Sequence, residues 1–221
     1  DYVAWNWKAN TLTTINTDGT IQSIVSANQA SGFSVVKYTG NTTAQTIGHG
    51  LSATPEMIIV KKLDGAQDWW VYHKDLNGGT NPSYYFIRLN TSDAEAFNAN
   101  SGGSIWNSTA PTSTVFSTGT TLQESSDYIA YCFHSVSGFS KIGTYTGNSS
   151  TQSITGLGFQ PSWLMIKEIN GSNSWRVFDS ARGLSSPQTL FPNLNSAEDS
   201  ESNTVSSFDA DGWTMGSQQG V

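Results

Sequence analysis

The sequence has little charge, a single cysteine and no long apolar run, and each shortage excludes a class of protein. Charged residues make up 12% of the 221 residues, about half the share usual for a soluble domain. The net charge is −7, without a basic stripe, which excludes binding to nucleic acid through its phosphates. Cys132 is the only cysteine, so the chain has no intramolecular disulfide and no cysteine-rich zinc site. No apolar stretch approaches the roughly 18 residues that a membrane span needs.

The residues that are abundant indicate β-structure. The chain is rich in small polar residues and aromatic residues and has 21 glycines. Its apolar runs are short and end at Gly, Asn, Asp or Pro. This texture predicts an all-β, antiparallel fold, with helical turns at most in 92–99 and 196–202. The expected strands are 34–39, 57–63, 69–74, 84–89, 114–117, 128–134, 141–146, 163–169, 174–179, 189–191 and 212–215.

The chain contains an internal duplication. The segment 32–41 recurs as 138–148, and the match continues at a shift of about 106 positions through Ile58–Lys61 against Leu164–Lys167 and Trp69 against Trp175. This predicts two homologous antiparallel β-sandwich repeats of jelly-roll or lectin-like type, residues 1–126 and 127–221. One large sandwich built from both halves is the alternative. The first repeat has an insertion that predicts an extra hairpin at about 10–31.

The position of the domain boundary depends on one repeated strand. Asp1-Tyr2-Val3-Ala4-Trp5 recurs as Asp127-Tyr128-Ile129-Ala130-Tyr131. We expect this strand to open each repeat, which places the boundary between residues 126 and 127. In the alternative, 128–134 closes the first domain and the second domain presents an unpaired edge, which a neighbouring chain could cover by strand addition.

Aromatic residues are the main candidates for a binding site. Trp69 and Trp70 are consecutive on an expected strand and therefore point to opposite faces. Trp69 matches Trp175 and is expected in the core, which leaves Trp70, with Tyr84 and Tyr85, as candidates for stacking on a sugar ring. Asp209 and Asp211 form a weak calcium candidate, because the remaining ligands of a calcium loop are absent. His49, His73 and His134 lie in no catalytic motif, so we expect no catalytic residues and no cofactor.

Several motifs together resemble a known family. They are Tyr2–Ala9, Gly32–Ser34 with Tyr38–Asn41, Ile47–Leu51, Pro55–Lys61, Asp68-Trp69, Tyr72–Lys74 and Tyr128–Phe133. This set resembles a tandem repeat found in structural and tail or fibre proteins of tailed phages, especially marine phages and cyanophages. The resemblance implies a location on the virion and contact with host glycans, and it supplies no catalytic residues.

The expected function is therefore adhesion without catalysis. We expect a structural component of a virion, in a homo-oligomer with other virion proteins, that recognises a host-surface polysaccharide. A secreted bacterial adhesin or carbohydrate-binding module is the alternative, and a polysaccharide-cleaving enzyme on a sandwich scaffold is less favoured. The acidic residues lie mostly in expected turns, whereas a catalytic pair of carboxylates should face inward from neighbouring strands.

Overall fold

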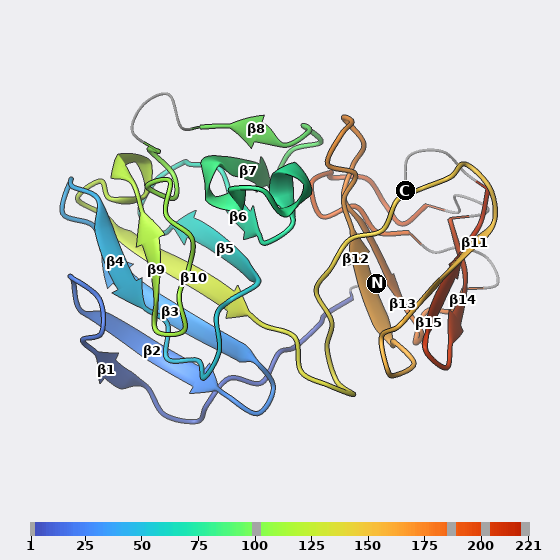
Figure 1. Ribbon diagram of the computed structural model, residues 1–221, viewed down its shortest axis with the longest axis horizontal. Coiled ribbons are helices and arrows are strands. Elements are labelled where there is room, and N and C mark those ends of the chain that lie inside the picture. The colour runs from blue at the N-terminus through green and yellow to red at the C-terminus, as the bar shows by residue number, and fades with distance from the viewer. Residues whose placement is uncertain (1–2, 99–102, 185–188, 200–203, 218–221) are drawn as a thin grey trace. The chain divides into compact units, whose positions relative to one another are not determined.

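The computed structural model describes residues 3–98, 103–184, 189–199 and 204–217, and it confirms the all-β, antiparallel class (Figure 1). Its helical segments are the short 3-10 turns η1 (Leu76–Gly79), η2 (Pro82–Tyr84) and η4 (Thr120–Leu122). No helix in these described ranges is long and apolar enough to cross a membrane. The strands are β1 (Thr14–Asn16), β2 (Ser23–Asn28), β3 (Phe33–Thr39), β4 (Gln45–Gly48), β5 (Met57–Lys62), β6 (Trp70–His73), β7 (Tyr85–Arg88), β8 (Ala96–Phe97), β9 (Val115–Thr118), β10 (Asp127–Phe133), β11 (Gln152–Thr155), β12 (Trp163–Ile166), β13 (Arg176–Asp179), β14 (Val205–Asp209) and β15 (Gly212–Met215).

The chain forms two compact units. Unit 1 comprises residues 1–86 and 96–136, and unit 2 comprises 87–95 and 137–221. The large sheet has the order β1-β2-β3-β10-β5-β6-β7-β8, and β4 pairs with β9 in a second sheet. One face of the large sheet carries the core of unit 1, whose fully buried members include Val36, Ile47, Ile58, Val60, Phe116, Leu122 and Tyr128.

Strand β10 belongs to unit 1, and the expected boundary between residues 126 and 127 is therefore wrong. β10 lies between β3 and β5 and pairs with both, so that Ala130 is opposite Val36 on one side and Val60 on the other. Its alternate residues Tyr128, Ala130 and Cys132 are fully buried. The strand closes the first core instead of opening the second. The matching segment at the start of the chain forms no strand within residues 3–10.

The extra hairpin of the first repeat is confirmed. β1 and β2 pair antiparallel, with Ile15 opposite Ile24. Between them, the side-chain carbonyl of Asn16 accepts a hydrogen bond from the Asp18 backbone N–H at 2.9 Å, as Asx turns do. The backbone then passes so close to β4 that a Cβ at Gly19 would lie 2.3 Å from the Thr46 carbonyl oxygen, so only glycine fits.

Unit 2 has a smaller core and shorter sheets. β11, β15 and β14 form a three-stranded sheet, and β12 pairs with β13 in a hairpin. The buried core residues are Ile166, Phe178, Val205, Trp213 and Met215, with partly buried Tyr145, Ile154 and Leu164 packed against them.

The duplication is preserved in the register of the strand pairs. In unit 1, Ile58 pairs with Tyr72 and Val60 with Trp70; in unit 2, Leu164 pairs with Phe178 and Ile166 with Arg176. The second pair of strands agrees as well, because Ile47 lies opposite Phe116 on β4–β9 and Ile154 lies opposite Trp213 on β11–β15. The rings of Tyr38 and Phe116 meet edge to face, and so do those of the matching Tyr145 and Trp213.

A lysine holds the same turn in both units. The Lys61 ammonium donates to the carbonyl oxygens of Lys62 and Gly65, at 2.9 and 3.3 Å. Lys167 donates to the carbonyl oxygens of Glu168 and Gly171, at 2.5 and 3.3 Å. Burial lowers the pKa of Lys167, which is partly offset by the nearby carboxylate of Glu168. The two units therefore share the same strand register, the same ring contact and the same turn structure.

Several of the secondary-structure expectations are wrong. Residues 141–146 form no strand, although the matching segment of unit 1 is β3. β3 is held between β2 and β10, whereas the sequence of unit 2 has no counterpart of the β1–β2 insertion, and no strand of its described residues takes the place of β10. Residues 92–98 form no helical turn and carry β8 at Ala96–Phe97, and residues 196–199 form no helical turn either; residues 99 and 200–202 lie outside the described residues. The expected strand at 189–191 is reduced to isolated bridges from Thr189 to Asp199 and from Leu190 to Val177.

Candidate functional site

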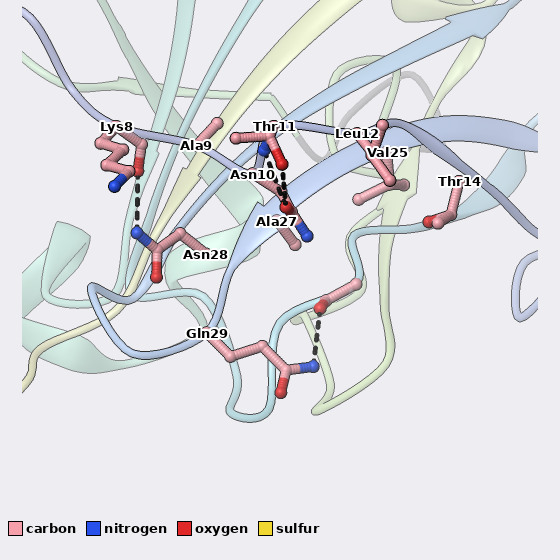
Figure 2. Close-up of a pocket in the computed structure, with 11 residues that line it drawn as sticks. Lys8, Ala9, Asn10, Thr11, Leu12, Thr14, Val25, Ala27, Asn28 and Gln29 are labelled. Carbon is pink, nitrogen blue, oxygen red and sulfur yellow. Dashed lines mark hydrogen bonds between the residues drawn. The ribbon is translucent and has the colours of Figure 1, made fainter.

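A groove of about 590 Å³ lies on unit 1, between residues 8–14 and strand β2 (Figure 2). The segment 8–12 runs beside β2 without forming a strand, so side chains and not a backbone ladder hold it in place. The lining residues are Lys8, Ala9, Asn10, Thr11, Leu12, Thr14, Val25, Ala27, Asn28, Gln29 and Gly50.

Hydrogen bonds from β2 position the outer wall of the groove. Asn28 Nδ2 donates to the carbonyl oxygen of Lys8 at 3.0 Å, and the Ser26 hydroxyl donates to that of Asn10 at 3.0 Å. Asn28 Oδ1 in turn accepts the backbone N–H of Ser31 at 3.2 Å, which fixes the orientation of its amide. Two side chains of one strand thus set the distance between the wall and the sheet.

The loop at Gly50 also lines the groove. Gln29 Nε2 donates to the Gly50 carbonyl oxygen at 3.2 Å (Figure 2). Gly50 has a φ of 70°, and a Cβ there would lie 2.7 Å from Cγ1 of Val25. Both facts require glycine, because any larger residue would be strained and would push into the floor of the groove.

The lining combines an apolar floor with polar rims. Val25 is buried and Ala27 is half-buried, whereas Asn10, Thr11 and Gln29 are exposed. Amide and hydroxyl groups both donate and accept hydrogen bonds, and Lys8 is the only charged residue in the lining. An arrangement of this kind suits a polar ligand with an apolar face and many hydroxyl groups.

The structure contradicts the expectation that Trp70 is a surface residue. Its exposed fraction is 8%, and its ring meets that of Phe86 edge to face with centroids 4.9 Å apart. The alternation along β6 was correct, but Trp70 lies opposite Val60, on the face that forms the core. Trp69 is half-buried, and the tryptophan with a large exposed fraction is Trp7, at 47%.

The other two aromatic candidates do not line the groove. Tyr84 ends η2 and Tyr85 begins β7, and both are half-buried. The Tyr85 ring meets the Phe97 ring of β8, with centroids 5.3 Å apart. Because Phe86 packs on Trp70, the neighbouring Tyr85 points to the opposite face of β7. The structure therefore does not bring Trp70, Tyr84 and Tyr85 together in one site.

The calcium candidates hold a turn of the protein itself. Asp211 accepts the backbone N–H groups of Gly156 and Gly158, at 3.0 and 2.5 Å, and these bonds lower the pKa of its carboxyl group. Asp209 accepts the hydroxyls of Ser207 and Thr214, both at 2.7 Å, which lowers its pKa in the same way. Within the described ranges, no three histidine, cysteine or acidic side chains gather where they could hold a metal ion.

The histidines bond to nearby backbone groups. His49 is fully buried: its Nδ1 accepts the Leu51 N–H at 3.1 Å, so its Nε2 carries the proton that bonds the Thr112 carbonyl oxygen at 3.2 Å. Burial lowers the pKa of His49 and also that of His73, whose Nδ1 accepts the Asp75 N–H at 3.2 Å. Both rings serve as neutral structural groups.

Sequence reasoning missed the groove because its polar lining residues lie in no motif; Lys8, Ala9 and Gly50 belong to motifs that indicate the family and not a binding site. Asn10, Thr11, Asn28 and Gln29 are four of many small polar residues in the chain. The one available signal was the insertion 9–31, which is present in a single repeat and contributes most of the lining.

The family of the chain is established over nearly its whole length. Residues 1–219 match the protein family described as a domain of unknown function, DUF7483. The chain has no significant match among curated proteins or solved structures.

Proposed function

Given that this chain belongs to the DUF7483 family, we propose that it is an adhesion module that binds a polysaccharide in the groove between residues 8–14 and β2. The observation that carries this proposal is the lining itself, with amides and hydroxyls above an apolar floor of Val25 and Ala27. A sugar ring presents the matching surfaces, because its hydroxyls exchange hydrogen bonds and its C–H faces pack on apolar atoms.

The groove favours binding over catalysis. Its lining contains one titratable residue, Lys8, and no carboxylate, whereas glycoside hydrolysis uses a pair of carboxyl groups about 5–10 Å apart. An extended site with hydroxyl-bearing rims fits a chain of sugars that lies along β2. The resemblance to tail and fibre proteins of phages supports a place on a virion, with the polysaccharide on the host surface.

A glycan array probed with the 221-residue chain tests the proposal, followed by titration calorimetry on the oligosaccharides that bind. We expect the double variant Asn28→Ala/Gln29→Ala to weaken binding about tenfold or more. Each good hydrogen bond to a ligand is worth about 0.5–1.5 kcal/mol, and loss of Asn28 also releases the outer wall.

The matched control is Gln22→Ala, which removes an exposed glutamine near β2 that does not line the groove. This variant should bind as the wild type does. The proposal fails if no glycan binds, or if the double variant, checked for folding by circular dichroism, binds as well as the control.

A secreted adhesin or carbohydrate-binding module would use the same groove, and the two proposals differ in where the protein resides. Immunogold labelling of purified phage particles whose genome encodes this chain distinguishes them, since label on the tail supports the virion. Release of reducing ends from a bound polysaccharide would contradict both proposals and indicate a polysaccharide-cleaving enzyme.

A further inference from the structure

Lys8, in the lining of the groove, differs from the other lysines of unit 1 in its partners. The others are bonded within the protein: Lys61 to backbone carbonyls, and Lys37, Lys62 and Lys74 to the carboxylates of Asp127, Glu124 and Glu56 at 2.7, 2.6 and 2.8 Å. The Lys8 ammonium is exposed and has no hydrogen bond or ion pair among the residues that the structure describes. Its backbone is nevertheless held at the groove, because the Lys8 carbonyl accepts Asn28 Nδ2 at 3.0 Å.

No carboxylate lines the groove beside this lysine. The chain has 17 acidic residues against 10 lysines and arginines, yet none of the acidic residues is in the lining. The net charge of −7 provides no long-range attraction for an anion, and such attraction is screened beyond about 10 Å in salt solution. The groove therefore carries a local positive charge on a protein that is negative as a whole.

Asn10 adds a hydrogen-bond donor to the same wall of the groove. Its Oδ1 accepts both the backbone N–H and the hydroxyl of Thr11, at 2.7 and 3.4 Å, which fixes the orientation of the amide (Figure 2). Its Nδ2 has no acceptor in the described part of the chain. The amide nitrogens of Asn28 and Gln29, by contrast, are used for the carbonyl oxygens of Lys8 and Gly50. The wall formed by residues 8–12 thus offers an ammonium and an amide N–H₂ group to a ligand.

We propose that the groove selects an acidic polysaccharide, in which the Lys8 ammonium and the Asn10 amide bind the carboxylate or sulfate ester of one sugar. This inference rests on the proposed function of the groove. Carboxylate and sulfate oxygens only accept hydrogen bonds, and so they match a wall whose available groups donate. Hydrogen bonds to a charged group are also stronger than those to a sugar hydroxyl.

The position of Lys8 gives the bound chain a direction. Figure 2 shows Lys8 and Asn28 at one end of the lining and Thr14 at the other, with Val25 and Ala27 between them. The acidic group therefore binds at the Lys8 end, and the apolar face of the neighbouring sugar packs on the floor.

A glycan array of neutral, uronate-containing and sulfated oligosaccharides, probed with the 221-residue chain, tests the proposal. We expect the glycans that bind to carry a carboxylate or a sulfate ester. Each of them is then compared by titration calorimetry with its carboxyl-reduced or desulfated form, which should bind at least about fivefold more weakly. The form that loses affinity identifies the acidic group as carboxylate or sulfate.

The variant Lys8→Gln, with Lys141→Gln as its matched control, tests the role of the lysine. Both substitutions remove one positive charge from an exposed side chain, but Lys141 belongs to unit 2 and does not line the groove. Lys8→Gln should bind the acidic glycan about fivefold more weakly and its neutral form unchanged, whereas Lys141→Gln and Lys8→Arg should bind as the wild type does. The difference should decrease as the salt concentration rises.

The outcomes separate this inference from the proposed function. Binding of neutral glycans in preference to acidic ones overturns the inference and leaves the proposed function standing. Equal effects of Lys8→Gln and Lys141→Gln overturn it as well, because net charge and not Lys8 would then decide the affinity. If no glycan of any class binds, the proposed function itself fails.

Discussion

Replacement of Trp70 by alanine is the sharpest test of the core of unit 1. The side chain is 8% exposed, it packs edge to face on Phe86, and it lies opposite the fully buried Val60. Truncation of a buried tryptophan removes its transfer free energy and leaves a cavity, which together cost about 3–5 kcal/mol. With a urea m-value of about 1–3 kcal/mol/M, the midpoint of the unfolding transition should fall by roughly 1 M or more.

The matched control is Trp7→Ala, which removes the same side chain from a position with 47% exposure. The Trp7 ring also meets that of Phe133 edge to face, with centroids 6.4 Å apart, so its removal should cost about 1 kcal/mol, well below the cost at Trp70. Unfolding should be followed by far-ultraviolet circular dichroism at low micromolar concentration, so that the lost tryptophan does not change the signal and the chain stays dissociated.

The two variants should therefore separate by several kcal/mol. Equal stabilities of Trp70→Ala and Trp7→Ala would refute the assignment of Trp70 to the core, and with it the register of β6 against β5. A selective loss of glycan binding by a fully stable Trp70→Ala would instead restore Trp70 as a surface residue that stacks on sugar.

Three further predictions follow from individual contacts. Gln123→Ala should cost about 1–3 kcal/mol in urea unfolding, because the buried amide bonds both the Asn41 N–H and the Thr118 hydroxyl at 3.2 and 2.7 Å. Lys61→Met should speed amide exchange of the turn after β5 while the global stability falls by no more than about 1 kcal/mol, since each turn bond is modest. Burial lowers the pKa of His49 below its ordinary 6.5, so the unfolded chain binds a proton at a higher pH than the folded chain does. The free energy of unfolding should therefore decrease as the pH falls below 6.5, and it should decrease less in the variant His49→Gln.

The strand pattern and the duplication were readable from the sequence because they rest on local signals. Runs such as Met57–Leu63 end at Asp64-Gly65, and the second copy ends at Asn170-Gly171, so turn chemistry marks both hairpins.

The face to which Trp70 points could not be read from the same signals. The residues on both faces of β5 and β6 are apolar: Ile58 and Val60 are buried on one face, and Ile59 and Val71 on the other. A strand with both faces buried shows no alternation between polar and apolar residues. Sequence comparison within the chain misled as well, because the counterpart Arg176 is charged and yet only 8% exposed.

The groove was outside the reach of sequence reasoning for a different reason. It arises where residues 8–12 run beside β2 without pairing with it, and amide and hydroxyl side chains that bond to backbone carbonyls hold this segment in place. Such bonds depend on three-dimensional approach and leave no periodic signal in the sequence.

Residues 141–146 form no strand, and this shows how strongly secondary structure depends on the adjacent strands of a sheet. Their sequence matches β3, and Tyr145 keeps the ring contact that Tyr38 makes. β-propensity chiefly measures packing against adjacent strands, and β3 has one on each side.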